Sequence, residues 1–287
     1  MRLIGKLIKF AFTLVVIAAV AVVGVYVYVK NTYGIDLYYT VQELITLCEE
    51  VDEATLCPNA FGSEDMVDVQ ATVNSSVDNL ITYTEQHGYV INLETLPPDM
   101  THLIKLTDKQ VGALADVMIE QEMGGRVTVS DHEIPVKLKQ VTFSEGEEGA
   151  TLLNTVVALD LSSLVALVPD SFPFSYVKPY IPKTLYVSST VIVTRGEEAF
   201  SYTVAHGSLT LNNLTKEETE DLFDTLDLLL KLGTADSLNQ GIGNAIMSAL
   251  VGTETDKGVA YALSDIGARD YDFLVEDDEI YFCVDII

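Results

Sequence analysis

The stretch TLLNTVVALDL, residues 151–161, has the period-two pattern of a β-strand with one buried face. Leu153, Val157 and Leu159 share that face, and Thr155 lies between them. Similar strands are predicted on both sides of it, at residues 126–130, 134–143, 184–194 and 199–211. Several of these exceed the usual five or six residues, which favours a sheet that curls around another element. We therefore predict an α+β fold with a large, curled, mostly antiparallel sheet and a few helices packed on it.

The strand predicted at 134–143 changes face partway along its length. Ile134 and Leu138 lie on one face, whereas Val141 and Phe143 lie on the other. Because the side-chain period of a strand is two, this change of phase predicts a β-bulge between the two halves.

Two capping boxes predict where helices begin. Thr107–Gln110 and Thr215–Glu218 each place a threonine three residues before a side chain that can bond back to its backbone N–H. Asp236 is predicted to cap a further helix. The C-terminal part of the chain predicts strands at residues 259–265, 269–276 and 279–287.

The N-terminal residues predict a membrane anchor. Residues 10–29 contain no charged or strongly polar side chain, and a helix of about 20 residues spans the roughly 30 Å core of a bilayer. Three basic residues precede this segment and one follows it, which predicts a cytoplasmic N-terminus. The alternative is a cleaved signal peptide, because Ala19-Val20-Ala21 offers the small residues of a cleavage site. We predict a single-pass plasma-membrane protein with a cytoplasmic tail at 1–9 and a transmembrane helix at 10–29.

The remainder of the chain divides into two predicted regions. Residues 31–100 have helical patterns at 40–51 and 64–86 and end near Pro97-Pro98, so we interpret them as a helical stalk or membrane-proximal segment. Residues 101–287 would form the α+β extracytoplasmic domain.

Charge and cysteine usage limit the partners and the chemistry. The formal net charge is −27, and the first thirty residues hold none of the 43 acidic residues. Such a body repels phosphates, so nucleic acid is not expected as a partner, whereas cations and basic proteins are compatible. Outside the cell, Cys48 and Cys57 are candidates for a disulfide; the alternative is that they are ordinary thiols.

No pattern in the sequence identifies a reaction. His206 and Ser208 are close in sequence, but the strained elbow of a serine hydrolase is missing. The acidic run Glu276–Glu279 offers calcium ligands or, alternatively, is a plain hairpin turn between two strands. The histidines lack metal-ligand spacing. We therefore expect no cofactor, no metal and no enzymatic activity.

Residues 161–194 differ from their acidic surroundings. They hold four of the eight prolines and the single acidic residue Asp170. This composition predicts either a face that touches lipid headgroups or a long crossover whose aromatic side chains complete the core. The candidate membrane-facing residues are Phe172, Phe174, Tyr176, Lys178 and Tyr180.

The element LTDKQVGAL, residues 106–114, followed by long strands and a proline-rich connection, resembles membrane-anchored proteins of Gram-positive bacteria in the tubular lipid-binding (TULIP-like) superfamily. The resemblance extends over residues 102–287. It implies a sheet that encloses an apolar channel able to hold an acyl chain, and it brings no catalytic residues. The residues expected to line such a groove are Val111, Leu114 and Met118, facing Val157 and Leu159.

The leading functional hypothesis is therefore a non-enzymatic, membrane-tethered extracytoplasmic domain that binds a lipid or another apolar ligand between sheet and helix. The alternative is a structural or protein-interaction module in cell-envelope assembly, with an envelope protein as its partner.

Overall fold

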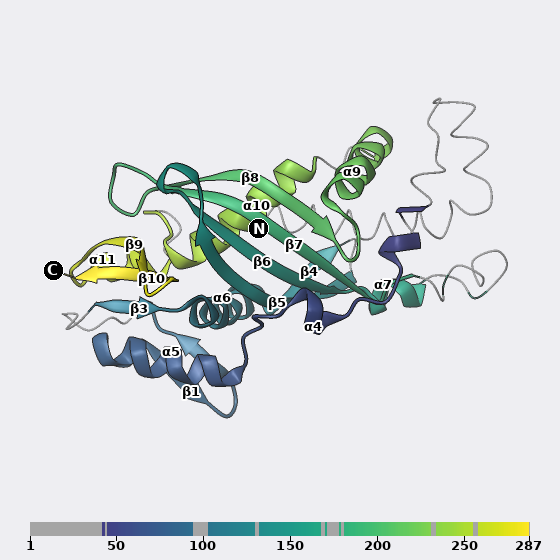
Figure 1. The fold of residues 1–287 in the computed structure, drawn as a ribbon. Helices are drawn as coiled ribbons and strands as arrows, with labels where there is room; N and C mark the ends of the chain where they lie inside the picture. Colours follow the sequence, from purple (N-terminus) through teal and green to yellow (C-terminus); the bar gives the residue numbers. More distant parts are fainter. Residues whose placement is uncertain are drawn as a thin grey trace.

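The computed structural model describes residues 42–43, 45–93, 103–129, 132–167, 170, 178, 181–230, 234–254 and 258–286. Its largest element is a five-stranded antiparallel sheet in the order β4-β5-β6-β7-β8 (Figure 1). The strands are β4 (Arg126–Val129), β5 (His132–Glu145), β6 (Thr151–Asp160), β7 (Thr184–Arg195) and β8 (Tyr202–Leu211). All four predicted neighbours of residues 151–161 are therefore strands of this sheet.

The predicted bulge in β5 is confirmed. The register between β5 and β6 shifts between Leu138 and Gln140, which leaves one extra residue on β5. The backbone N–H of Leu138 donates to Oδ1 of Asp116, at 3.0 Å, so a helix side chain satisfies a group that the bulge removes from the ladder.

Two smaller sheets complete the β structure. One has the order β3-β10-β9, with β3 (Ile104–Leu106), β9 (Ala268–Glu276) and β10 (Glu279–Ile286). The other is the hairpin of β1 (Ile81–Thr84) and β2 (Gly88–Ile91).

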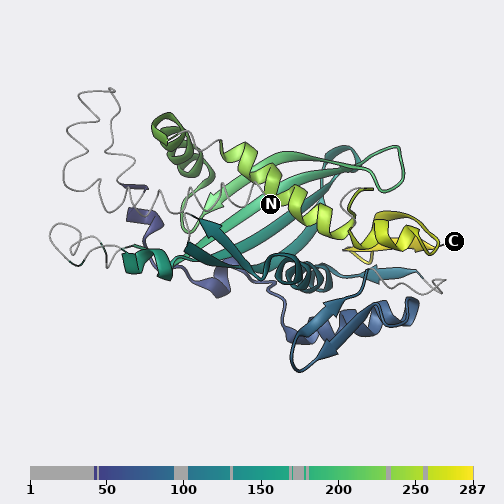
Figure 2. The same ribbon diagram turned by 180° about the vertical axis from the view of Figure 1, so that it is seen from behind.

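Helices cover both faces of the large sheet. The helices α6 (Asp108–Met123) and α10 (Ala235–Leu250) pack on one face, against β5 and against β7 and β8 respectively (Figure 2). On the other face, Cys57 beside α4 (Glu53–Leu56) is buried with Val156 and Ala158 of β6. The other helices are α5 (Ser63–Ser76), η2 (Glu147–Gly149), α7 (Ser162–Leu167), α9 (Lys216–Leu230) and α11 (Val259–Ser264).

Both predicted capping boxes are confirmed. The N–H of Gln110 donates to the Thr107 hydroxyl at 3.3 Å, and the N–H of Thr107 donates to the Gln110 side chain at 3.0 Å. Thr215 and Glu218 exchange the same pair of bonds at the start of α9. The prediction that Asp236 caps α10 is wrong by two residues, because the Thr234 side chain accepts from the N–H of Ser237.

The strand predicted at 259–265 is wrong, because these residues form α11. Val259, Ala260, Ala262 and Leu263 are all buried, and a short apolar run buried on most sides has the same composition in a helix as in a strand. Gly258 allows the chain before α11 to pass close to α10, because a Cβ there would lie 2.4 Å from the Ser248 carbonyl oxygen.

The prediction of one large curled sheet is also wrong. The described strands divide into three separate sheets, none of them strongly curled, and the largest ends at β4 and β8, which do not pair with each other (Figure 1). The predicted transmembrane helix at residues 10–29 lies outside the described residues. No helix within the described ranges is both long and apolar enough to cross a membrane.

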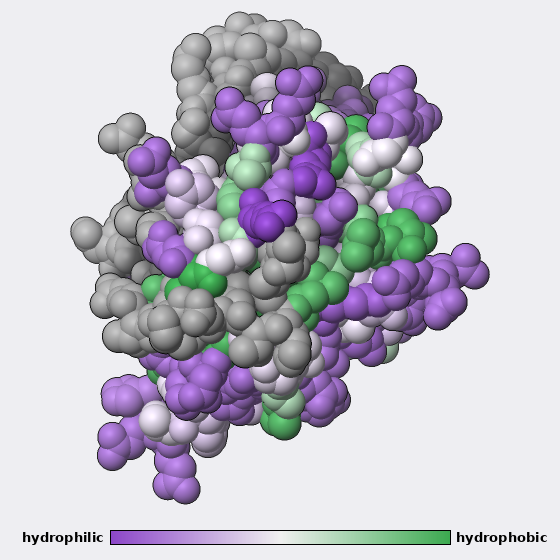
Figure 3. Space-filling view, turned by 90° about the vertical axis from the view of Figure 1, so that its left-hand side faces the viewer, coloured by the Kyte–Doolittle hydropathy of each residue, from purple (hydrophilic) through white to green (hydrophobic). Residues whose placement is uncertain are grey.

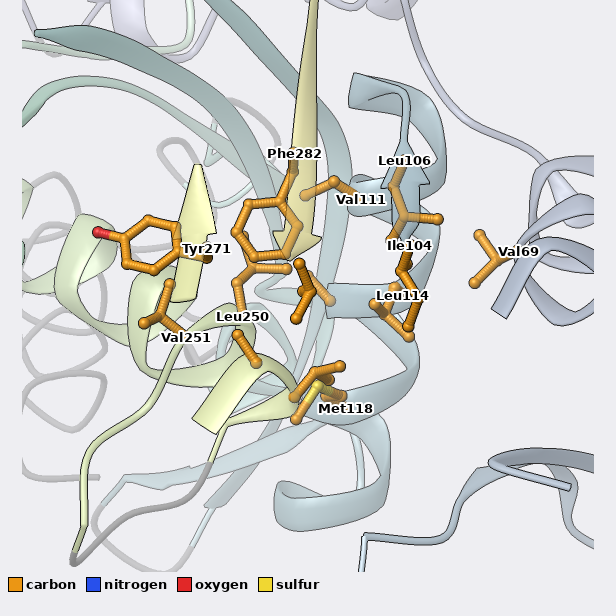
Figure 4. Packing of buried hydrophobic residues seen from close by; sticks show 14 of the residues in the cluster. Val69, Ile104, Leu106, Val111, Leu114, Met118, Leu250, Val251, Tyr271 and Phe282 are labelled. Atoms are coloured by element: carbon orange, nitrogen blue, oxygen red, sulfur yellow. The ribbon is translucent and has the colours of Figure 1, made fainter. Parts of the chain in front are cut away.

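The main hydrophobic core lies where the sheets and helices meet. Val69 of α5 joins it, so a segment before residue 100 shares one core with the later elements. In Figure 4, side chains from α5, β3, α6, α10, β9 and β10 converge, with Phe282 and Tyr271 among the largest. Both rings are fully buried.

Candidate ligand-binding cleft

A cleft of about 600 Å³ lies at the N-terminal end of α6. Three other segments complete its wall: the end of β5, the turn between β9 and β10, and the loop before α5. Its lining residues are Asn59, Thr107, Asp108, Lys109, Phe143, Ser144, Glu145, Val275, Asp278, Glu279 and Ile280. The volume lies within the range of about 300–1,000 Å³ that is typical of small-molecule sites.

Pairing of β3 with β10 brings distant parts of the chain to this cleft. Leu106, the last residue before the capping box of α6, lies opposite Phe282 of β10. The turn between β9 and β10 therefore lies beside the first turn of α6. Asp277 and Asp278 both have positive φ, 51° and 66°, as a two-residue hairpin turn that matches the twist of its strands requires.

The loop at residues 57–62 is fixed by two contacts. The N–H of Asn59 donates to the Gln140 side chain at 2.8 Å, and Gln140 itself is buried at the bulge of β5. The ring of Phe61 lies against Gly112 of α6, where a Cβ would come within 2.5 Å of Phe61 Cδ1. The bulge and a glycine thus position one wall of the cleft.

Carboxylates dominate the charge of the cleft. Asp108, Glu145, Asp278 and Glu279 line it, against the single cation Lys109. The N-terminal amides of α6 do not attract an anion, because those of Lys109 and Gln110 already donate to Asp108 and Thr107. Burial is the main cause that raises the pKa of Asp108, and Glu279 adds to the shift. The cleft therefore favours a cationic ligand.

Apolar side chains form the rest of the wall. Phe143 packs against Phe273, with ring centroids 5.1 Å apart. Val275 is 53% exposed although it is a large hydrophobic residue, and Ile280 lies opposite it in the ladder. Figure 3 faces the end of the molecule that carries α11, where hydrophilic side chains surround small hydrophobic patches. A ligand with both a charge and an apolar group fits these surroundings.

The same hairpin binds a cation of its own chain. Lys105 of β3 pairs with Glu276, and its ammonium lies 3.8 Å from the centroid of the Tyr281 ring. The bond to Glu276 is the main cause that raises the pKa of Lys105. Glu276 and the Tyr281 ring of this hairpin thus bind an ammonium group of the same chain.

The residues predicted to line a lipid groove lie in the core. Val111, Leu114 and Met118 of α6 are at most 5% exposed, and Figure 4 places them among side chains of β3, β10 and α10. Val157 packs against the same cluster, and Leu159 is fully buried farther along β6.

Most of the predicted membrane-facing residues, Phe172, Phe174, Tyr176 and Tyr180, lie outside the described residues. Lys178 is described: it is half-buried and pairs with Asp170 at 2.7 Å. The predicted bridge between Cys48 and Cys57 is not present in the structure, where both are free thiols.

His206 belongs to a partly buried polar network that also contains Asn239 and Asp236. Asn239 of α10 donates to the Thr190 carbonyl at 2.9 Å and lies 2.8 Å from Nδ1 of His206. Because a carbonyl only accepts, the Asn239 nitrogen is the atom that faces both the Thr190 carbonyl and Nδ1 of His206. Nε2 lies 3.1 Å from Asp236. The network joins α10 to the bulge between β7 and β8.

The described residues contain no cluster of three or more histidine, cysteine or acidic side chains placed to hold a metal ion. Sequence reasoning identified two parts of the cleft, the capping box and the acidic turn, but not their proximity. Comparison with protein-family models, curated proteins and solved structures finds no match to this chain. The resemblance to tubular lipid-binding proteins stays a prediction.

Proposed function

We propose that the protein is a non-enzymatic interaction module, and that the cleft at the N-terminus of α6 binds a basic, partly apolar segment of a partner protein. The observation that carries this proposal is the composition of the cleft, in which four carboxylates surround an apolar wall that includes the exposed Val275. The carboxylates can pair with the basic side chains of such a segment, and the apolar wall can contact its hydrophobic side chains.

This proposal corresponds to the interaction-module alternative from the sequence. The lipid hypothesis is less well supported, because the side chains expected to contact an acyl chain are packed in the hydrophobic core. Displacing that packing would cost several kcal/mol. The single-pass plasma-membrane location, with the domain outside, stays a prediction from residues 1–30.

Fluorescence anisotropy with three labelled five-residue peptides tests the proposal. One alternates lysine with leucine, one alternates lysine with serine, and one alternates glutamate with leucine. We expect only the lysine–leucine peptide to bind well, with an affinity that falls as salt is added. Equal binding of all three peptides, or of none, would contradict the proposal.

Two double variants with the same net charge locate the site. Glu145→Gln with Asp278→Asn removes carboxylates from the cleft, whereas Glu85→Gln with Glu197→Gln removes exposed carboxylates elsewhere. Rim charges contribute up to about 1 kcal/mol each, so the first pair should weaken binding by about three- to tenfold. The second pair should leave the affinity nearly unchanged. Native mass spectrometry of the purified protein tests the lipid hypothesis separately.

A further inference from the structure

Glu43 is a largely buried carboxyl group with one unpartnered oxygen. It lies among the helical residues 42, 43 and 45–47, and only 7% of its surface is exposed. Its Oε2 atom is buried and has no hydrogen-bond partner in the part of the chain that the structure describes. Ionisation of this group is unfavourable in the docked segment, because the charged form loses hydration at Oε2 and gains no hydrogen bond there.

The groups that face Glu43 make ionisation still less favourable. They are the carboxylates Glu218 and Asp221 on α9. Burial, followed by repulsion from Asp221 and then Glu218, raises the pKa of Glu43 to about 7. The described residues hold no metal-type cluster that would supply a compensating cation. Protonation of Glu43 itself therefore removes the unfavourable charge.

The segment that carries Glu43 is held to the domain by two asparagines. Asn212 donates to the Leu47 carbonyl at 2.7 Å and accepts from the N–H of Tyr186 at 2.7 Å, so it joins the segment to β7. Asn213 donates to the Glu49 carbonyl at 3.3 Å. Leu47 is 3% exposed. The backbone around Leu47 and Glu49 is therefore hydrogen-bonded to the corner between β8 and α9.

We propose that the segment carrying Glu43 and Leu47 forms a proton-dependent latch, which is docked against this corner when Glu43 is protonated and is released when Glu43 ionises. The direction of the pH dependence of docking follows from the linkage between docking and protonation. A carboxyl whose pKa is raised by docking binds its proton more tightly in the docked state. Docking is therefore strongest at acidic pH, weakens as the pH rises from 4.5 to about 7, and changes little at higher pH.

The rate at which the Cys48 thiol is labelled reports the release of the latch, because Cys48 follows Leu47 in the chain. It is half-buried, and burial raises its pKa to about 11, which suppresses the reactive thiolate. We would label the full-length protein with 4,4′-dithiodipyridine between pH 5 and 8.5 and measure the rate at Cys48 by site-resolved mass spectrometry. The rate for Glu43→Gln at each pH corrects for the intrinsic pH dependence of the thiol.

The ratio of the wild-type rate to the Glu43→Gln rate should be lowest at pH 5 and should rise by at least about tenfold by pH 8, because each unit by which docking raises the pKa of Glu43 corresponds to about a tenfold change in docking. The exposed Glu49→Gln is the matched control and should keep the wild-type profile. The buried Cys283 reports global unfolding and should stay unreactive. A flat ratio, or a parallel rise at Cys283, would overturn the latch.

Discussion

The ring of Phe61 packs directly on Gly112, where a side chain on the helix would come 2.5 Å from Phe61 Cδ1. Gly112 is thus the position on α6 that lets the 57–62 loop approach and form one wall of the cleft.

Gly112→Ala should displace Phe61 and the loop. The gain of about 1 kcal/mol in helix propensity would be offset by an overpacking cost of about 1–3 kcal/mol, so the net change in stability should be small. Affinity for the lysine–leucine peptide should fall more clearly than the denaturation midpoint, and adding Phe61→Leu should restore part of it. Wild-type affinity in the single variant would show that the loop does not shape the cleft.

Asn239→Ala should destabilise the protein by at least about 2 kcal/mol. It removes the partner of the Thr190 carbonyl, of the Ser189 hydroxyl and of Nδ1 of His206, and each buried group left without a partner costs about 1–3 kcal/mol. Urea denaturation measures the loss. The adjacent, exposed Gln240→Ala should cost less than about 0.5 kcal/mol. Similar losses in both variants would mean that the network does not anchor α10.

Asp116→Asn should stabilise the protein at neutral pH. Burial is the main cause that raises the pKa of Asp116, so ionisation penalises the folded state. An asparagine oxygen can still accept from the N–H of Leu138 without that penalty. The stability gain of Asp116→Asn over the wild type should therefore be absent below the ordinary aspartate pKa and should grow as the pH rises above it. Denaturant midpoints at pH 3 and pH 8 test this. Asp116→Ala, which leaves Leu138 without its partner, should be destabilising at both.

The sequence predicts local features of this fold better than their assembly. The bulge near Leu138 and the box at Thr107 depend on a few consecutive residues, whose side chains and backbone interact with one another. The helix at Val259–Ser264 was missed because its burial comes from contacts with the neighbouring elements α10 and β9, which the composition of its own six residues does not show.

The cleft was missed for a related reason. The acidic turn near Asp278 and the first turn of α6 each have a recognisable pattern, but only the pairing of Leu106 with Phe282 places them side by side. Alternation within a strand says which residues share a face, and does not say which strands become neighbours. The same limit explains why a curled sheet was wrongly predicted, because the residue pattern of each strand is the same in an open sheet and in a closed one.

A comparison of two valine-to-lysine variants tests the central claim, that the cleft binds a basic segment, most directly. Val275 in the cleft and Val67 on α5 are 53% and 52% exposed, so both substitutions change the net charge equally at sites that tolerate a longer side chain. We predict that Val275→Lys weakens binding of the lysine–leucine peptide by about tenfold or more, which corresponds to about 1.4 kcal/mol, whereas Val67→Lys changes it less than about twofold. Equal effects of the two variants would contradict the account, because binding would then follow the overall charge of the protein.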